Sequence, residues 1–587
     1  MNLNRREFIR LMGLAGAAGL LPGSGLRAGE DGSALYDMPA FGNARILHFT
    51  DCHAQLNPIY FREPSVNIGM GGAYGKAPHL VGNHLLERFS IPRGGIEEHA
   101  YTFLNFAEAA ATYGKVGGFA HLATLVKKLR AEYAQGRSLL LDGGDTWQGS
   151  GTALWTRGRD MVDACNLLGV DVMTGHWEFT YQDAEVLANA AAFNGEFVSQ
   201  NCKVRETAMF DYELGDIGDF NEDSGHVFKP YTIREMGDLR IAVVGQSFPY
   251  TPIANPQRFI PDWTFGINED DMQDIVNQAR DEEKPDGLIL LSHNGMDVDL
   301  KMASRVSGID AIFGGHTHDG VPGAISVSNS AGKTLVTNAG SNGKFLGVMD
   351  MDYKGGRLRD FRYRLLPIFS NLLQSDADMT AQIQGSRKPY LPQLQEELSV
   401  AENLLYRRGN FNGSFDQIIC DALRVEGDAQ ISLSPGFRWG TTVLPGQTIT
   451  MEHVLDQTCI TYPETYVREM SGEDLKLILE DVADNLFNKD PYYQQGGDMV
   501  RLGGLDYSIE PDAAAGTRIA DMQLDDGTRI EASKTYKVAG WATVGSQSSG
   551  APIWEVVADY LRRSDSASIS KLNTPKLKNV AGNPGIG

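Results

Sequence analysis

Acidic and imidazole side chains are concentrated in five short clusters of the sequence. Each cluster holds at least one Asp or His beside glycine or a polar turn residue. The clusters are Asp51-Cys52-His53, Gly143-Gly144-Asp145, Gly175-His176-Trp177-Glu178, Ser292-His293-Asn294-Gly295 and Gly314-Gly315-His316-Thr317-His318. Carboxylate and imidazole together suit divalent first-row metals such as Mn, Fe or Zn. The clusters therefore predict a metal site rather than unrelated structural histidines.

Short apolar segments precede these clusters and predict the buried strands that position them. Each segment is bounded by glycine or polar residues, as buried strands commonly are. The segments lie at residues 46–49, 138–141, 170–173, 241–244, 288–291 and 311–313. Between two of them, one apolar helical face is formed by Phe119, Leu122, Leu125, Val126 and Leu129. Strands that alternate with helices indicate an α/β layered domain over residues 40–366.

All five clusters follow a predicted strand, and this common position suggests a shared site. In open α/β sheets, ligand sites form outside the carboxyl ends of the strands, so the clusters should converge on one crevice. The Asp-x-His and His-x-His spacings point alternate side chains to the same side of an extended segment. Five of the twelve histidines lie in the clusters. We therefore expect them to act together as ligands.

The remainder of the chain suggests a second domain and one long insertion. Residues 57–118 are rich in glycine and aromatic residues with little periodicity, and we expect an insertion folded over the mouth of the site. Residues 367–408 form a predicted connector that is partly helical. Residues 409–565 predict a smaller, mixed α/β domain that contributes substrate contacts. The tail after Ser564 is poor in hydrophobic residues, and we expect it to be attached only loosely.

The first 28 residues have the pattern of a twin-arginine signal peptide. Arg5-Arg6 precedes an apolar run from Leu11 to Leu21, and Ala28 follows at a plausible cleavage position. The run is too short for a stable membrane span, and no later segment reaches the required length. We therefore expect export to the periplasm in the folded state, with metal already bound.

Composition and charge narrow the classes of partner. The 587 residues are 42% hydrophobic and 22% charged, which is typical of a globular protein of two or more domains. The formal net charge of −23 disfavours nucleic acid, whose binding normally needs basic surfaces. A small anionic substrate remains possible, because metal ions and a few arginines can hold an anion inside a pocket.

The five cysteines show no redox or metal-binding pattern. They are Cys52, Cys165, Cys202, Cys420 and Cys459, and none forms a C-x-x-C pair. Their odd number leaves at least one thiol unpaired within a monomer. We expect all five to be mainly structural.

The order D-x-H, G-D-x-x-x-G, G-x-x-E, H-N-G and G-G-H-x-H resembles the calcineurin-like metallophosphoesterase superfamily and, within it, the two-domain 5′-nucleotidase family. The resemblance covers roughly residues 40–565. It implies a four-layer α/β metallophosphoesterase domain followed by a smaller mixed α/β domain of the 5′-nucleotidase C-terminal type. It further implies two metal ions bridged by Asp145. One would be held by Asp51, His53, Asp145 and His318, and the other by Asp145, His176, His293 and His316.

Two departures from the nucleotidase pattern concern the reaction itself. This chain has His176-Trp177 where that family has Asn-His, and Thr180 where it has an Asp. A metal ligand thus changes from amide to imidazole, and the catalytic His–Asp pair is absent. Loss of this pair should lower the rate of a phosphoesterase by orders of magnitude. The rate should fall far less if the leaving group is already a stable anion, such as a persulfide.

The segments at residues 50–56 (Thr-Asp-Cys-His-Ala-Gln-Leu) and 175–179 (Gly-His-Trp-Glu-Phe) resemble the SoxB family of bacterial thiosulfohydrolases. The resemblance implies a periplasmic enzyme with two Mn²⁺ ions, Zn²⁺ or Fe being possible substitutes. The implied substrate is a cysteine S-thiosulfonate on the carrier protein SoxYZ. Hydroxide held by the metal pair would attack the sulfone sulfur, releasing sulfate and leaving a persulfide on the carrier.

We assign catalytic roles to Asp145, His176, Trp177 and Arg438, and substrate contacts to Arg438, Arg408 and Trp177. Arg438 lies where nucleotidases keep an N-G-G-x-R segment, and its planar guanidinium could clamp a sulfonate; the alternative is a solvated arginine in a turn. Trp177 would be either a wall of the substrate channel or ordinary packing. Glu178 is expected to orient a ligand. Two other functions remain open, a 5′-nucleotidase-type phosphoesterase and a non-catalytic metal- or carrier-binding protein.

Overall fold

The computed structural model describes residues 32–134, 136–209, 212, 220–221 and 223–587. The signal peptide predicted at residues 1–28 lies outside these residues. Among the helices that the structure describes, none is both long and apolar enough to cross a membrane.

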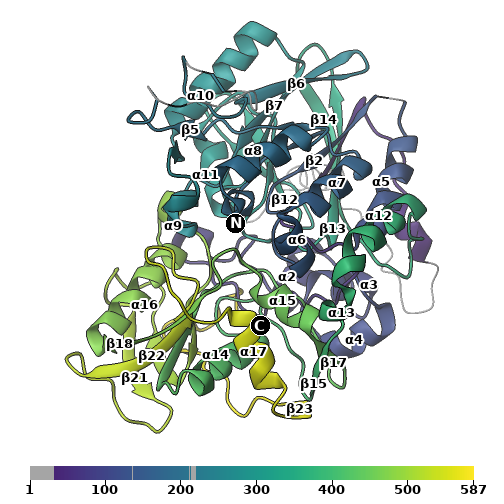
Figure 1. Cartoon of the computed structure of the whole chain (residues 1–587). Coiled ribbons are helices and arrows are strands. Elements are labelled where there is room, and N and C mark those ends of the chain that lie inside the picture. Colours follow the sequence, from purple (N-terminus) through teal and green to yellow (C-terminus); the bar gives the residue numbers. More distant parts are fainter. Residues whose placement is uncertain (1–31, 135, 210–211, 213–219, 222) are drawn as a thin grey trace, which may run out of the picture.

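Two six-stranded sheets form the centre of the first domain (Figure 1). The first sheet contains, in spatial order, β14 (Leu358–Pro367), β13 (Phe345–Tyr353), β1 (Ala44–Phe49), β2 (Ser138–Asp142), β3 (Val172–Met173) and β4 (Glu196–Phe197). The second contains β11 (Ile325–Ser328), β12 (Lys333–Asn338), β10 (Ala311–Gly314), β9 (Gly287–Ser292), β7 (Leu239–Gln246) and β6 (Tyr231–Met236). All six predicted strands are present, although the third is limited to two residues. The sheets give the predicted α/β class.

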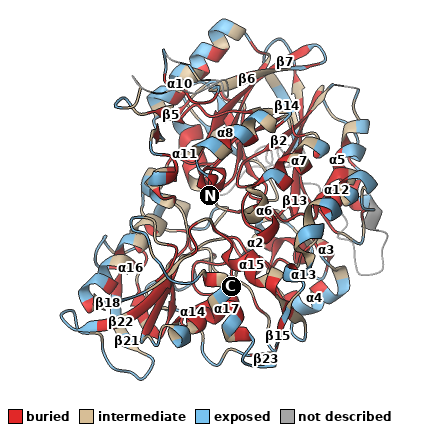
Figure 2. Ribbon diagram, viewed as in Figure 1, coloured by how far each residue is buried: buried red, intermediate tan, exposed pale blue. Residues whose placement is uncertain are grey.

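The alternation of side chains along the strands divides the core into layers. In β9, Ile289 and Leu291 pack in one core cluster together with residues of the first sheet. Leu288 and Leu290 point the other way and pack with helices α10 (Glu269–Gln278) and α11 (Met296–Arg305). Helices α5 (Phe119–Ala131) and α7 (Arg159–Leu168) cover the first sheet. The order helix, sheet, sheet, helix is the expected four-layer arrangement. The inner strands β1, β9 and β10 are buried throughout, whereas the edge strands β6, β11 and β14 are partly exposed, and buried residues are concentrated in the middle of this domain (Figure 2).

The smaller domain contains three sheets and four main helices, which lie together in the lower half of Figure 1. One sheet has the order β18 (Thr465–Ser471), β22 (Thr535–Trp541), β16 (Ile431–Ser434) and β19 (Arg501–Gly503). The second has the order β17 (Thr448–Thr450), β15 (Glu397–Ala401) and β23 (Ser566–Ala567), and the third β21 (Ile519–Leu524), β20 (Leu505–Ile509) and β24 (Lys576–Leu577). The helices are α14 (Ser414–Glu426), α15 (Met451–Thr458), α16 (Gly472–Phe487) and α17 (Ile553–Leu561). Because β15 belongs to this domain, the domain begins near residue 397 and not at the predicted 409. The preceding helix α12 (Ala377–Arg387) contacts α5 and α7 of the first domain.

The segment 57–118 and the tail after Ser564 link the two domains. The segment contains α2 (Gly82–Phe89), α3 (Ile96–Tyr101) and α4 (Phe106–Tyr113). Its Tyr60 forms a backbone bridge with Thr442, and its Val66 forms one with Ile586. The prediction of a loosely attached tail is therefore wrong. Backbone hydrogen bonds hold the tail, and such bonds do not require hydrophobic side chains.

All five cysteines are free and buried.

Candidate metal centre

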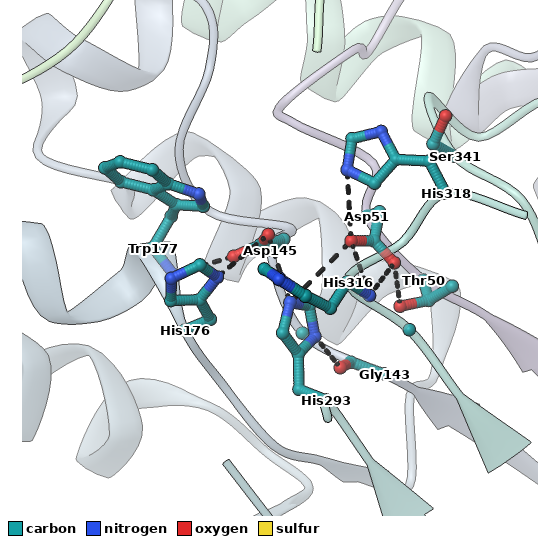
Figure 3. A network of polar contacts seen from close by, with 12 residues as sticks. Thr50, Asp51, Gly143, Asp145, His176, Trp177, His293, His316, His318 and Ser341 are labelled. Atoms are coloured by element: carbon teal, nitrogen blue, oxygen red, sulfur yellow. Dashed lines mark hydrogen bonds and ion pairs between the residues drawn. The ribbon is translucent and has the colours of Figure 1, made fainter. Parts of the chain in front are cut away.

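Seven side chains gather where five parallel strands end, and Figure 3 labels all of them except His53. They follow β1, β2, β3, β9 and β10, whose carboxyl ends lie along one edge of the two sheets. The side chains form two buried groups whose ligand atoms lie within 4.8 Å of one another: Asp145, His176, His293 and His316 in one, and Asp51, His53, Asp145 and His318 in the other. Asp145 is common to both. The structure thus brings together every residue predicted as a ligand.

The distances around Asp145 place its carboxylate between the two groups. Its Oδ2 lies 3.1 Å from His293 Nε2, 3.3 Å from His176 Nδ1 and 3.8 Å from His53 Nε2. On the other side, His318 Nε2 lies 3.3 Å from Asp51 Oδ1. A carboxylate in this position can bridge two cations.

Several ring nitrogens in the site lack an ordinary hydrogen-bond partner among the described residues. His53 Nε2 and His318 Nε2 face each other at 3.1 Å, although at most one of two neutral rings can donate there. His293 Nε2 and His316 Nε2 are buried without a partner of hydrogen-bond geometry. Burial lowers the pKa of His53 to about 4 and that of His318 well below its usual value, which keeps both rings in the neutral form that binds metal. These features fit a pair of divalent metal ions.

The loops that carry the ligands adopt an unusual backbone conformation. Five of the seven ligand residues have positive φ angles: Asp51 (52°), His53 (46°), Asp145 (57°), His316 (72°) and His318 (58°). Non-glycine residues rarely adopt this conformation, which costs roughly 1–3 kcal/mol for each residue. This conformation turns the backbone sharply after each strand and directs the five side chains into the shared site. Gly315 makes the turn before His316 possible, because a Cβ there would overlap Thr50 Oγ1.

Neighbouring polar groups fix the orientation of the ligands. His293 Nδ1 donates to the Gly143 carbonyl at 2.6 Å, which leaves Nε2 directed into the site. The Asp51 carboxylate accepts from Thr50 Oγ1 at 2.6 Å and from the backbone N–H of His316 at 3.0 Å. The contact between Asp51 and His316 ties a ligand of one group to a ligand of the other before metal binds.

Glu178 joins the loops that follow β2 and β3. Its carboxylate accepts hydrogen bonds from four backbone N–H groups, namely those of Thr146 (2.7 Å), His176 (2.8 Å), Trp147 (3.1 Å) and Asp145 (3.2 Å). Glu178 is fully buried. The predicted orienting role is therefore carried out through the backbone of two ligand residues.

Trp177 closes one side of the site. Its ring makes edge contacts with Trp439 and Phe437 of the smaller domain, at centroid distances of 5.0 and 5.3 Å. Its backbone N–H donates to Asp145 Oδ1 at 2.7 Å. Trp439 in turn lies 5.4 Å from the ring of His53. The Trp177 ring therefore packs in the interface between the domains beside the ligands, and its role as a wall of the substrate channel stays a prediction.

Two buried arginines lie beside the loop that carries His316 and His318. Arg408 donates to the Thr317 carbonyl at 2.9 Å, and Arg438 donates to the Gly497 carbonyl at the same distance. Their side chains are 3% and 10% exposed, so the alternative of a solvated turn arginine at position 438 is wrong. Arg408 Nε and Arg438 Nη1 lack hydrogen-bond partners, and Arg438 Nε has only the Asp498 carboxylate, 3.5 Å away. Each guanidinium group thus keeps one N–H group without a partner near the ligands, while others of its nitrogens face the carboxylates of Asp498 and, for Arg408, Asp319.

The loop at residues 494–498 was not predicted from the sequence to be part of the site. A Cβ on Gly496 would overlap His316 Nε2, so the loop approaches the metal ligands closely. Asp498 lies 3.5 Å from Arg438 and 3.8 Å from Arg408 and partly balances their charge. The adjacent glycines Gly496 and Gly497 were the sequence signal that could have indicated this loop, but pairs of glycines are common in turns.

Comparison with known proteins connects this site to one family. Residues 399–559 match the family model described as 5′-nucleotidase, C-terminal domain. The structure matches that of the sulfate thiohydrolase SoxB from Thermus thermophilus with a TM-score of 0.85 and 35% sequence identity, over 93% of this chain and 98% of that one. The chain belongs to the SoxB group of the 5′-nucleotidase family. A 5′-nucleotidase precursor from Thermus thermophilus (TM-score 0.70, 19% identity, 91% and 99% of the two chains) shares the fold.

More distant relatives are nucleotide phosphoesterases. The trifunctional nucleotide phosphoesterase YfkN of Bacillus subtilis is 26% identical to this chain, over 75% of the chain and 31% of the relative. The snake venom 5′-nucleotidase of Gloydius brevicauda is 25% identical, over 52% and 53% of the two proteins. The matched regions thus span about half or less of these relatives.

Proposed function

We propose that this protein is a periplasmic thiosulfohydrolase that releases sulfate from a cysteine S-thiosulfonate on a SoxYZ carrier. The observation that carries the proposal is the likeness to Thermus SoxB over nearly the whole of both chains, which includes both domains of the site. The Arg5-Arg6 pattern supports export through the twin-arginine pathway.

Each part of the site has a place in this reaction. Two Mn²⁺ ions held by the seven ligands would supply Lewis acidity and a water of lowered pKa. Arg438 Nη1–H and Arg408 Nε–H, which have no partner among the described residues, would bind the sulfonate oxygens. Trp177 and Trp439 would exclude bulk water from one side, which strengthens these charge interactions.

The aromatic residues favour this substrate over a nucleotide. Phe437 and Trp439 stack on each other at a centroid distance of 4.0 Å, and Trp177 makes edge contacts with both. Their facing surfaces are therefore occupied and cannot enclose a nucleobase. At the position of the nucleotidase acid, Thr180 is buried and donates to the Trp177 carbonyl at 2.8 Å. The second candidate, a nucleotide phosphoesterase, rests on the sequence relatives.

A direct substrate comparison tests the proposal. The Mn²⁺-loaded protein would be incubated with a SoxYZ carrier bearing a cysteine S-thiosulfonate and, separately, with 5′-nucleotides. Sulfate and phosphate would be measured by ion chromatography. We expect sulfate release and no comparable phosphate release. Phosphate release alone would support the phosphoesterase, and tight carrier binding with neither product would support a non-catalytic role.

Replacing Arg438 by Met should weaken substrate binding. Losing a buried guanidinium that binds a sulfonate should cost about 1.5–3 kcal/mol, which corresponds to a rise in KM of roughly 10- to 100-fold. Steady-state sulfate release would measure this rise. Arg562→Met provides a control, because Arg562 forms a half-exposed ion pair with Glu396 in the same domain. An unchanged KM in R438M would remove the clamp role.

A further inference from the structure

A second His–Asp pair lies next to the metal ligands. His79, from the segment 57–118, contacts Asp297 of α11 through Nε2 and Oδ2 at 2.8 Å. Their side chains are 13% and 15% exposed. Both line a small cavity that is also lined by His316 and Arg438. The pair therefore faces the same space as one metal ligand and one of the two candidate sulfonate-binding arginines.

The His79–Asp297 pair lies between the metal centre and the outside of the protein. A larger groove adjoins the cavity, and the two share Ile68, His79, Asp297, Leu486 and Gln494. A carrier protein must remain outside, because the cavity is too small to admit it. His79, His316 and Arg438 line the same small cavity, so a sulfonate bound at His316 and Arg438 would bring the adjoining sulfur atom toward His79.

The surroundings of His79 favour a charged ring, whose Nδ1 has no side-chain partner and only the Asn67 backbone beside the ring. Burial alone would lower the pKa of His79, but the Asp297 carboxylate outweighs this effect and the pKa is raised. His79 Nδ1 is buried and has no hydrogen-bond partner of good geometry among the described residues. The charged and polar groups that act on the pair are Asp297 of α11, Asp319 after β10, Arg438 of the smaller domain and the Asn67 backbone. When Nε2–H is bound by Asp297, Nδ1–H can be offered to an anion.

We propose that His79, held by Asp297, is a further catalytic residue that donates a hydrogen bond to the departing persulfide sulfur. The proposal rests on the thiosulfohydrolase function proposed above. In the reaction, the oxygen of water forms a bond to the sulfone sulfur, and the S–S bond breaks with its electron pair kept by the inner sulfur. The products are sulfate, the carrier persulfide anion and two protons. His79 keeps its proton and stabilises the negative charge that develops on the inner sulfur. This role compensates for the His–Asp pair that is absent at positions 177 and 180.

The test compares His79→Gln with His84→Gln, a control from the same segment whose side chain is exposed. In the Mn²⁺-loaded protein acting on a thiosulfonated carrier, H79Q should lower kcat and kcat/KM by about 10²-fold with KM and metal content unchanged. The wild-type kcat/KM should also decline as the pH rises through the pKa of His79, because the neutral ring stabilises the anion less. H79Q should lack this decline, whereas H84Q should behave as wild type.

The outcomes separate this proposal from the function on which it rests. If the wild-type protein releases no sulfate, the proposed function fails and the role of His79 fails with it. If the wild type is active and H79Q matches it in kcat and pH profile, only the role of His79 is overturned. A loss of activity in H79Q together with loss of metal or of folded protein, measured by metal analysis and circular dichroism, would also overturn it. Asp297→Asn should reproduce the H79Q profile more weakly, because the ring remains but its charge is no longer stabilised.

Discussion

Replacing Asp145 by Asn should abolish sulfate release while the protein remains folded. The Asp145 carboxylate lies within 3.1–3.8 Å of His293, His176 and His53, and it belongs to both ligand groups. Asn is nearly isosteric but has one oxygen and an NH₂ donor, so it cannot bridge two cations. We expect turnover to drop by at least about 10³-fold and bound metal to fall below two ions per chain. Sulfate assays, metal analysis and circular dichroism would measure the three quantities.

The control for this change is Asp163→Asn. Asp163 forms an exposed ion pair with Arg159 on the surface of α7, where exposed pairs contribute little. D163N should retain activity and both metal ions. Wild-type turnover or a full metal complement in D145N would contradict the bridging role.

Replacing Glu178 by Gln should weaken both metal binding and the fold. Four backbone N–H groups point at the Glu178 carboxylate, and those of Asp145 and His176 belong to ligand residues. Gln keeps one oxygen and directs an NH₂ group at donors that then lack an acceptor. We expect metal affinity to fall by about 10- to 100-fold and the free energy of unfolding by about 1–3 kcal/mol. Isothermal titration with Mn²⁺ and urea denaturation of the metal-free protein would measure these effects.

Glu185→Gln is the matched control, because Glu185 forms a half-exposed ion pair with Arg157. It should change neither quantity appreciably. If E178Q bound metal with wild-type affinity, the loops after β2 and β3 would not depend on this carboxylate. If it lost stability without losing affinity, Glu178 would be structural only.

The positions of the ligands could be predicted because they depend on local patterns. Apolar strands followed by Asp or His identify strand ends, and parallel strands bring their carboxyl ends to one edge of a sheet. Asp51, His53 and Asp145 were found in this way. The resemblance to a known family then suggested how the ligands divide into two groups, and the structure has the same two groups.

Other parts of the site depend on contacts that no local pattern encodes. His79 and Asp297 are 218 positions apart, and neither lies in a recognisable motif. The four contacts of Glu178 are made by backbone groups, which every residue carries. The same reason explains the tail, whose Gly587 N–H donates to the Ser65 carbonyl. Sequence periodicity shows which side chains are apolar, so it does not predict long-range polar contacts or backbone hydrogen bonds of this kind.

Anomalous diffraction from crystals of the Mn²⁺-loaded protein would test the central claim most directly. Data collected on both sides of the manganese edge should show two peaks, one surrounded by Asp51, His53 and His318 and the other by His176, His293 and His316. The Asp145 carboxylate should contact both. A single peak, or two peaks of which Asp145 touches only one, would contradict the account of a bridged metal pair.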